Sequence, residues 1–278
     1  MATKKKVKDS QTKVTEKSLV SGLNLERLRK LNIWLTVAFF LQAIAVVVIG
    51  GSKSAPISSQ YLALDQLSSQ STGHQVLAVA TRHLFDMHFT VAAAIFLVVF
   101  GFTTLAMATF CRNRYEEQLQ RNSNSPRWLA FAFAGAFIVA ALGLEGGISD
   151  LGGILAIFAL TLVGIGLLPA VEKMRKEGVS VVVSKSVLVA ALGLIAIPWL
   201  IFILDILSAL MWNGHIPGNV YFMFLVTFLL FGCWLLAMRF HARQRGKWSD
   251  VIYSEKMYML LSFLIGSILA WQMFAGAS

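Results

Sequence analysis

Charged residues are scarce in this chain. Asp, Glu, Lys and Arg make up 14% of its 278 residues and hydrophobic residues make up 57%, whereas soluble domains usually carry about 25% charged residues. Cysteine is rarer still, since Cys111 and Cys233 are the only two. The first shortage excludes an ordinary soluble domain, and the second argues against a disulfide framework or a cysteine-ligated metal.

Long apolar runs make up most of the chain instead. A helix needs about 20 mainly apolar residues to cross a bilayer, and seven runs of roughly that length occur here. We therefore predict an all-α membrane protein built as a seven-transmembrane-helix bundle, with six spans and one re-entrant segment as the alternative. The predicted spans are roughly residues 32–51, 89–110, 128–144, 151–170, 186–211, 219–240 and 257–275.

The basic residues occur at alternate connections between these runs. Of the 24 Lys and Arg residues, only Lys53 and Arg82 lie in the first, third and fifth connections. Cytoplasmic loops are enriched in Lys and Arg, so we predict a cytoplasmic N-terminus, an external C-terminus and a multi-pass protein of the plasma membrane. The chain then consists of a basic cytoplasmic tail (1–31) and a transmembrane domain (32–276). A long external loop (52–86) follows the first span, and both strand and short helix are possible in it.

The net charge of +10 would by itself also suit a nucleic-acid-binding protein. Here the cations stand beside membrane spans, where they set the topology and contact anionic lipid headgroups. We therefore expect membrane lipids as partners and no nucleic acid.

Charge is nearly absent from the predicted spans themselves. Only Asp205 and Arg239 occur within them, near the ends of the fifth and sixth spans. Proton pumps and ion-coupled transporters place ionisable groups near mid-membrane. This distribution disfavours a pump and makes a channel or carrier the weakest of the hypotheses that remain.

A set of polar residues is expected on the external side. If residues 83–86 were helical, two of the set would share a face and could favour a metal site. A polar rim at the level of the lipid headgroups is the simpler interpretation, and we predict no metal. The set is His83, Asp86, His88, Glu145, Asp150 and His215.

Several short motifs follow one another along the chain in a specific order. They are Leu25–Ile33, Leu84-Phe-Asp-Met87, Arg127-Trp128, Ile148-Ser-Asp-Leu151, Pro198-Trp199, Gly246-Lys-Trp-Ser-Asp250, Tyr258-Met-Leu-Leu-Ser262 and Leu269–Gly276. In order and spacing, the chain resembles the heliorhodopsins, seven-helix retinal proteins with a cytoplasmic N-terminus. The resemblance implies a rhodopsin-like bundle and a homodimer, and the orientation predicted from the basic residues agrees with it.

Two positions depart from that family's pattern. The family's last helix carries a lysine that forms a Schiff base with retinal, in the pattern Leu-Ser-x-x-x-Lys-x-x-Leu-x-Trp. The run from Leu261 to Trp271 has Gly266 at the lysine position. The family's counterion is the glutamate of Arg-Trp-x-Glu, and Ala130 stands in its place. The resemblance therefore implies that retinal is not bound covalently. The two losses are consistent, because a carboxylate without its cation would be a buried unpaired charge.

Loss of the lysine and its chromophore would leave a void, which is costly unless something fills it. Neighbouring side chains could fill it, or a non-covalently bound retinal, other apolar ligand or lipid could occupy it. On the same alignment, Thr104 and Thr161 replace a histidine and an asparagine of the family. The predicted lining of the cavity is Phe131, Phe133, Phe137, Thr104, Thr161, Trp234, Ser262 and Trp271.

The leading hypothesis is a heliorhodopsin-like membrane protein without covalent retinal. We expect it to be sensory or regulatory, to act through an unidentified membrane or cytoplasmic protein partner, and to be neither an enzyme nor an ion pump. The alternative is a protein that binds retinal, another apolar ligand or a lipid non-covalently in the same cavity.

Overall fold

The computed structural model describes residues 2–120, 125–212, 214, 216–243 and 246–276. Within these residues, seven helices are long and apolar enough to cross a membrane, which confirms the predicted seven-helix bundle. They are α1, α3 and α5 to α9. The elements are α1 (Ala2–Ile49), β1 (Ser54–Leu64), α2 (Gln66–Thr72), β2 (Leu77–His88), α3 (Phe89–Ala108), α4 (Arg112–Gln120), α5 (Ser125–Glu145), α6 (Leu151–Lys176), α7 (Val181–Met211), α8 (Gly218–Arg243), the 3₁₀ helix η1 (Gly246–Ser249) and α9 (Val251–Gly276).

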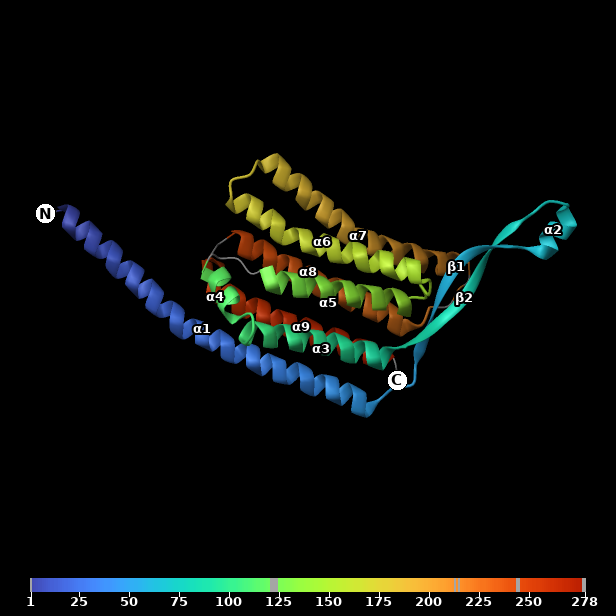
Figure 1. Cartoon of the computed structure of the whole chain (residues 1–278), viewed down its shortest axis with the longest axis horizontal. Coiled ribbons are helices and arrows are strands. Elements are labelled where there is room, and N and C mark those ends of the chain that lie inside the picture. Colours follow the sequence, from blue (N-terminus) through green and yellow to red (C-terminus); the bar gives the residue numbers. More distant parts are fainter. Residues whose placement is uncertain (1, 121–124, 213, 215, 244–245, 277–278) are drawn as a thin grey trace.

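The seven helices lie side by side (Figure 1). Helix α3 contacts α1, α5 and α9, while α6 lies between α5 and α7, and α8 contacts α9. Helix α7 packs against α8 through Trp199, whose ring centroid lies 5.2 Å from the ring centroids of both Phe224 and Phe228. The hairpin lies at one end of the bundle and α4 at the other (Figure 1). We call these the hairpin end and the basic end.

Small residues allow the helices to approach closely. A Cβ on Gly164 of α6 would lie 2.8 Å from Ile195 Cγ1 and 3.0 Å from the Ala191 carbonyl oxygen of α7, so only glycine fits at this crossing. On α5, the small residues that repeat every four positions are all buried: Ala132, Ala136 and Ala140. Small residues at this spacing let a neighbouring helix approach closely.

The long connection between the first two spans is a β-hairpin that extends away from the bundle (Figure 1). β1 and β2 pair antiparallel, and α2 lies at the tip. Asp65 caps α2, because its carboxylate accepts hydrogen bonds from the Ser68 hydroxyl at 2.6 Å and the Ser68 amide at 3.2 Å. These bonds lower the pKa of Asp65. The sequence leaves strand and short helix open for this loop, and both occur.

The base of the hairpin is held by the turn between α5 and α6. The Ser58 amide donates to the Ser149 carbonyl at 2.8 Å. The Asp150 carboxylate accepts from the Gln60 amide of β1 at 3.1 Å and from the Gly153 amide in the first turn of α6 at 2.9 Å. One carboxylate therefore caps α6 and binds the hairpin to it.

Ion pairs join α1 to α4 at the basic end. Arg112 contacts Glu116 at 2.7 Å and Glu26 of α1 at 3.4 Å. The hydrogen bond to Glu116 is the main cause that raises the pKa of the Arg112 guanidinium. These side chains are partly exposed, so the pairs orient α4 more than they stabilise it.

A buried contact joins α4 to α9 at the same end. The Tyr115 hydroxyl donates to Glu255 Oε1 at 2.6 Å, and both residues are 3% exposed. The sequence predicts Asp205 and Arg239 as the only charges within the spans, and this is wrong. Several candidate spans extend beyond the predicted bounds and include further charged residues at their ends. The last begins at Val251 and so includes Glu255 and Lys256.

We expect Tyr115→Phe to lower the free energy of unfolding by about 1 kcal/mol, the usual net contribution of an intramolecular hydrogen bond. The loss follows because the Glu255 carboxyl stays buried without this donor. Reversible unfolding in mixed detergent micelles measures it. Tyr221→Phe removes a hydroxyl from a side chain that is 36% exposed and serves as the control. Equal losses for the two variants would contradict the assignment.

Candidate functional site

Gly266 is buried in α9, facing α1 and α3. A Cβ at this position would lie 3.2 Å from Phe39 Cε1 and 3.4 Å from Phe100 Cε2. The Phe39 and Phe100 rings stack with centroids 5.3 Å apart and an interplanar angle of 19°. Both side chains are almost fully buried. A longer side chain at 266 would therefore have to displace an aromatic ring.

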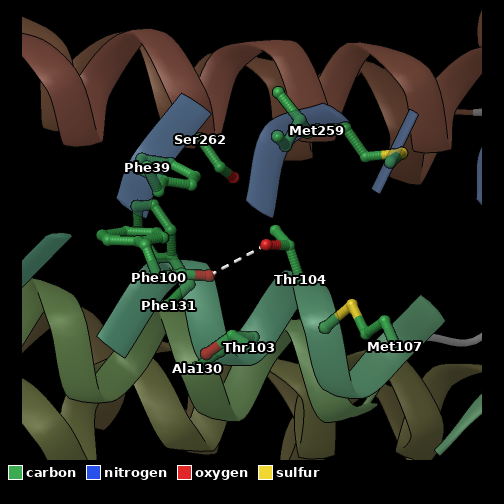
Figure 2. Close-up of a pocket in the computed structure, with 10 residues that line it drawn as sticks. Phe39, Phe100, Thr103, Thr104, Met107, Ala130, Phe131, Met259 and Ser262 are labelled. Atoms are coloured by element: carbon green, nitrogen blue, oxygen red, sulfur yellow. Dashed lines mark hydrogen bonds between the residues drawn. The ribbon is translucent and has the colours of Figure 1, made fainter. Parts of the chain in front are cut away.

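A small cavity lies beside these rings (Figure 2). Its volume is about 20 Å³, close to the space of a single water molecule. Pockets for drug-sized ligands usually measure about 300–1,000 Å³, so this cavity is too small for a polyene. It is lined by Leu35, Phe39, Phe100, Thr103, Thr104, Met107, Ala130, Phe131, Met259 and Ser262.

The polar atoms of Thr104 at this cavity already have partners within the bundle. Its hydroxyl lies 2.8 Å from the Thr36 hydroxyl and donates to the carbonyl oxygens of Gly101 and Phe100 at 2.9 and 3.2 Å. The second of these carbonyl bonds is drawn in Figure 2. Ala130 contributes only a methyl group to the cavity wall. The site therefore lacks a charged group at either of the two positions that the sequence singles out.

Aromatic side chains close the cavity on the α8 side. Phe131 of α5 stacks on Trp234 of α8 with centroids 3.7 Å apart and planes 4° from parallel. Trp128 meets the same indole edge to face at 4.9 Å. Side-chain packing, rather than an open pocket, occupies the space between α1, α3, α5 and α9.

The heliorhodopsin family model matches residues 28–278 of the chain. The chain belongs to the heliorhodopsin family. It is therefore a rhodopsin-like, multi-pass membrane protein, a class of protein that is not typically enzymatic. None of the curated proteins compared with the chain matches it.

The predicted lining residues of this heliorhodopsin separate into several places. Thr104, Phe131 and Ser262 line the small cavity, with Trp234 stacked behind Phe131. Phe137 lines a different cavity at the hairpin end. The other three lie elsewhere: Phe133 is 45% exposed and packs on Phe158, Thr161 is buried with an unpaired hydroxyl, and the Trp271 indole donates to Gln42 at 3.0 Å.

The sequence does not predict the two residues that contact position 266. Phe39 and Phe100 fill the space in front of Gly266, and neither is in the predicted lining. Apolar residues surround both of them in the sequence, and a helix in a membrane can turn an apolar residue toward lipid or toward the bundle. Only the rotation of α1 and α3 about their axes decides which.

Glu145 does not belong to an external polar rim. Both of its carboxylate oxygens are buried within the bundle without a hydrogen-bond partner, as are both amide atoms of Gln272. The two residues border a hollow of about 10 Å³ that Thr227 also lines. This polar group lies between α5, α8 and α9 at the hairpin end. It is a second feature of the heliorhodopsin bundle that residue spacing does not reveal.

The remaining members of the predicted rim also lie apart. His83 and Asp86 are on β2 rather than on a helix, and their side chains form an exposed pair at 3.1 Å. Asp150 caps α6, and His215 lies outside the described residues. Among the residues that the structure describes, no three His, Cys, Asp or Glu side chains are grouped as a metal site would require.

Proposed function

We propose that this heliorhodopsin works without covalently bound retinal and acts through contacts with other proteins, as a sensory or regulatory membrane protein rather than an ion pump. The observation that carries the proposal is the packing of Phe39 and Phe100 against Gly266. At the position that the resemblance assigns to the retinal lysine, there is no amine and no room for one.

No other lysine is well placed to substitute. Lys256 lies ten residues before Gly266 in α9, which corresponds to about 15 Å along a helix. Lys185 is exposed in the second turn of α7 at the basic end. The proposal therefore extends to the whole bundle and not only to position 266.

The hairpin and the basic loops are the surfaces proposed for partners. In the proposed orientation the N-terminus is cytoplasmic and the hairpin is external, at the plasma membrane. Large apolar side chains on the hairpin are exposed although they lie outside the spans, among them Leu62 at 67% and Val79 at 66%. Contiguous apolar surface of this kind usually marks a protein or membrane contact. A second copy of the chain is the proposed partner there, with signalling partners at the basic loops.

The test is spectroscopic. We expect the chain, expressed with all-trans-retinal and purified, to show no visible absorption band that hydroxylamine bleaches. A heliorhodopsin that has the lysine and the glutamate serves as the positive control. Borohydride reduction followed by mass spectrometry gives a second measurement, and a retinyl adduct on any lysine of the chain would overturn the proposal.

Non-covalent retinal at the same site is the weaker proposal. A cavity of about 20 Å³ would have to expand several-fold to hold it, because an engineered cavity that binds benzene, a far smaller molecule, measures about 150 Å³. Organic extraction of the purified protein followed by mass spectrometry distinguishes the two proposals. Stoichiometric retinal in the extract, without a covalent adduct, would favour the non-covalent one.

A further inference from the structure

A second, larger cavity lies where the hairpin meets the bundle. Its volume is about 170 Å³, and it is distinct from the small cavity beside Gly266. Residues of the hairpin, α3, α5 and α6 all contribute to it. The lining is Ile57, Met87, Phe89, Ala92, Phe137, Ala140, Ala141, Leu144, Ile154, Leu155 and Phe158.

The cavity exists because three of the residues that line it are alanines, whose side chains are too small to fill the space between the helices. Ala92 of α3 and Ala140 of α5 are 2% and 7% exposed, and Ala141 is partly buried. Their methyl groups do not reach across the space that Phe137 and Phe158 border. The root of the hairpin covers the hollow through Ile57, which packs with Phe89 and Leu144.

An apolar molecule suits this cavity better than water does. Each lining side chain is aliphatic, aromatic or a thioether, and a buried water needs two to four polar partners. Apolar cavities of about 150 Å³ stay dry and bind benzene. The space here therefore suits about six carbon atoms of an aliphatic or aromatic molecule.

The position of the cavity points to a lipid as the source. Apart from Ile57 and Met87 of the hairpin, its lining residues belong to the first turn of α3, the first two turns of α6 and the last turns of α5, all within segments that can cross a membrane. Leu155 borders the cavity and is 56% exposed on the outside of α6, a surface that faces acyl chains in a bilayer. A chain from the leaflet on the hairpin side can therefore enter sideways.

A cation lies beside the same place. The Phe89 amide donates to the Lys53 carbonyl oxygen at 3.4 Å, so Lys53 adjoins the cavity at its Phe89 edge. Lys53 is exposed and is one of only two basic residues in the connections of this side. Its ammonium group can attract a phosphate at headgroup level, above the first turn of α3.

We propose that this cavity binds a segment of about six carbons of an acyl chain of an anionic phospholipid, close to the headgroup, with the phosphate near Lys53. The bound chain contacts Ile57 and Met87 of the hairpin as well as α3, α5 and α6, so it stabilises the hairpin in its position on the bundle. This site is separate from the position of the retinal lysine and does not depend on whether the chain binds retinal.

The test counts retained lipids. The full chain is reconstituted with phosphatidylglycerol or phosphatidylcholine, extracted in mild detergent and examined by native mass spectrometry. We expect wild-type protein to retain one more phosphatidylglycerol per chain than Ala141→Phe, which fills the cavity. Ala196→Phe, the same change at an exposed position of α7, should retain as many as wild type. Equal retention by wild type and Ala141→Phe would overturn the proposal.

Lys53→Gln tests the headgroup. We expect it to abolish a preference for phosphatidylglycerol over phosphatidylcholine, and the absence of any such preference in wild type would overturn the anionic assignment.

A second test uses the wild-type protein and therefore still applies if Ala141→Phe does not fold. Delipidated wild type, at benzene concentrations ten times the Kd, should gain about 2–4 °C in Tm. Ala196→Phe should gain as much, and a folded Ala141→Phe should gain nothing. No shift in wild type at benzene saturation would contradict an apolar binding cavity here.

Discussion

The double variant Gly266→Lys, Ala130→Glu should remain colourless when it is expressed with all-trans-retinal. It restores the two groups that a retinal Schiff base needs, an amine and a carboxylate. The obstacle is space, since a Cβ at 266 already lies 3.2 Å from the Phe39 ring. The adjoining cavity measures only about 20 Å³. The new lysine would have to push the ring pair aside before any polyene could enter.

Removing the rings should reverse this result. Phe39→Ala and Phe100→Ala, added to the double variant, delete the two side chains that contact position 266. We expect this quadruple variant to form a visible band that hydroxylamine bleaches, because the new hollow lies directly in front of the lysine. Absorption spectra of all variants, recorded beside their melting curves, make the comparison. Colour in the double variant alone would show that the rings do not block the site.

Matched controls separate the effect of added space from the effects of the new amine and carboxylate. The same two phenylalanine truncations without Lys at 266 should remain colourless, because they create space but no amine. Gly266→Lys without Ala130→Glu should give little or no colour, since a protonated imine needs an anion nearby in a medium of low dielectric.

Phe39→Ala should cause the largest loss of stability of any single substitution considered for this protein. The side chain is 1% exposed, and its ring contacts those of Phe100 and Phe263 at centroid distances of 5.3 and 5.2 Å. Truncation of a buried phenylalanine to alanine costs about 3–5 kcal/mol. Because Phe39 of α1 packs against both α3 and α9, the cavity that its truncation leaves cannot be closed by the movement of one helix.

Phe102→Ala is the matched control for this prediction. Phe102 lies on α3, as Phe100 does, but is 58% exposed and faces the outside of the bundle. Its truncation should cost much less, since lipid or detergent replaces the lost contacts. Reversible unfolding in mixed micelles measures both free energies. Similar losses for Phe39→Ala and Phe102→Ala would mean that the ring cluster does not stabilise the bundle.

The sequence predicts the seven spans of this protein because each is a long apolar run, although the helices of the structure extend some of them by five to eight residues, as at Asn24, Arg175, Val181 and Val251. The errors occur at the ends of spans. Glu145 and Glu255 are polar residues at the margins of apolar runs, where hydropathy suggests a loop. The helices continue past those margins, and the bundle encloses both side chains.

The sequence predicts the ends of the helices better than it predicts which side chains face the interior of the bundle. The resemblance to the heliorhodopsins identifies Gly266 and Ala130 as positions of interest, and the structure brings Ala130 and the rings that pack on Gly266 to one cavity. It does not identify Phe39 or Phe100, since a phenylalanine in a membrane helix is equally acceptable toward lipid. Periodicity gives no rotation for a helix that is apolar on every side.

The sequence does not decide between strand and helix for residues 52–86 for a related reason. Apolar and polar residues do not alternate regularly along the two strands of the hairpin, and a bulge between Ile57 and Ser58 shifts the register near the base. Pairing between residues as distant as Ser54 and His88 is a non-local property that short-range patterns do not encode.

Asp150 joins the hairpin to α6 through a single side chain. Its two carboxylate oxygens accept from the Gln60 amide of β1 and from the Gly153 amide of α6. A substitution that removes this carboxylate therefore breaks both bonds at once, so the hairpin loses a side-chain attachment at its base and α6 loses its N-cap.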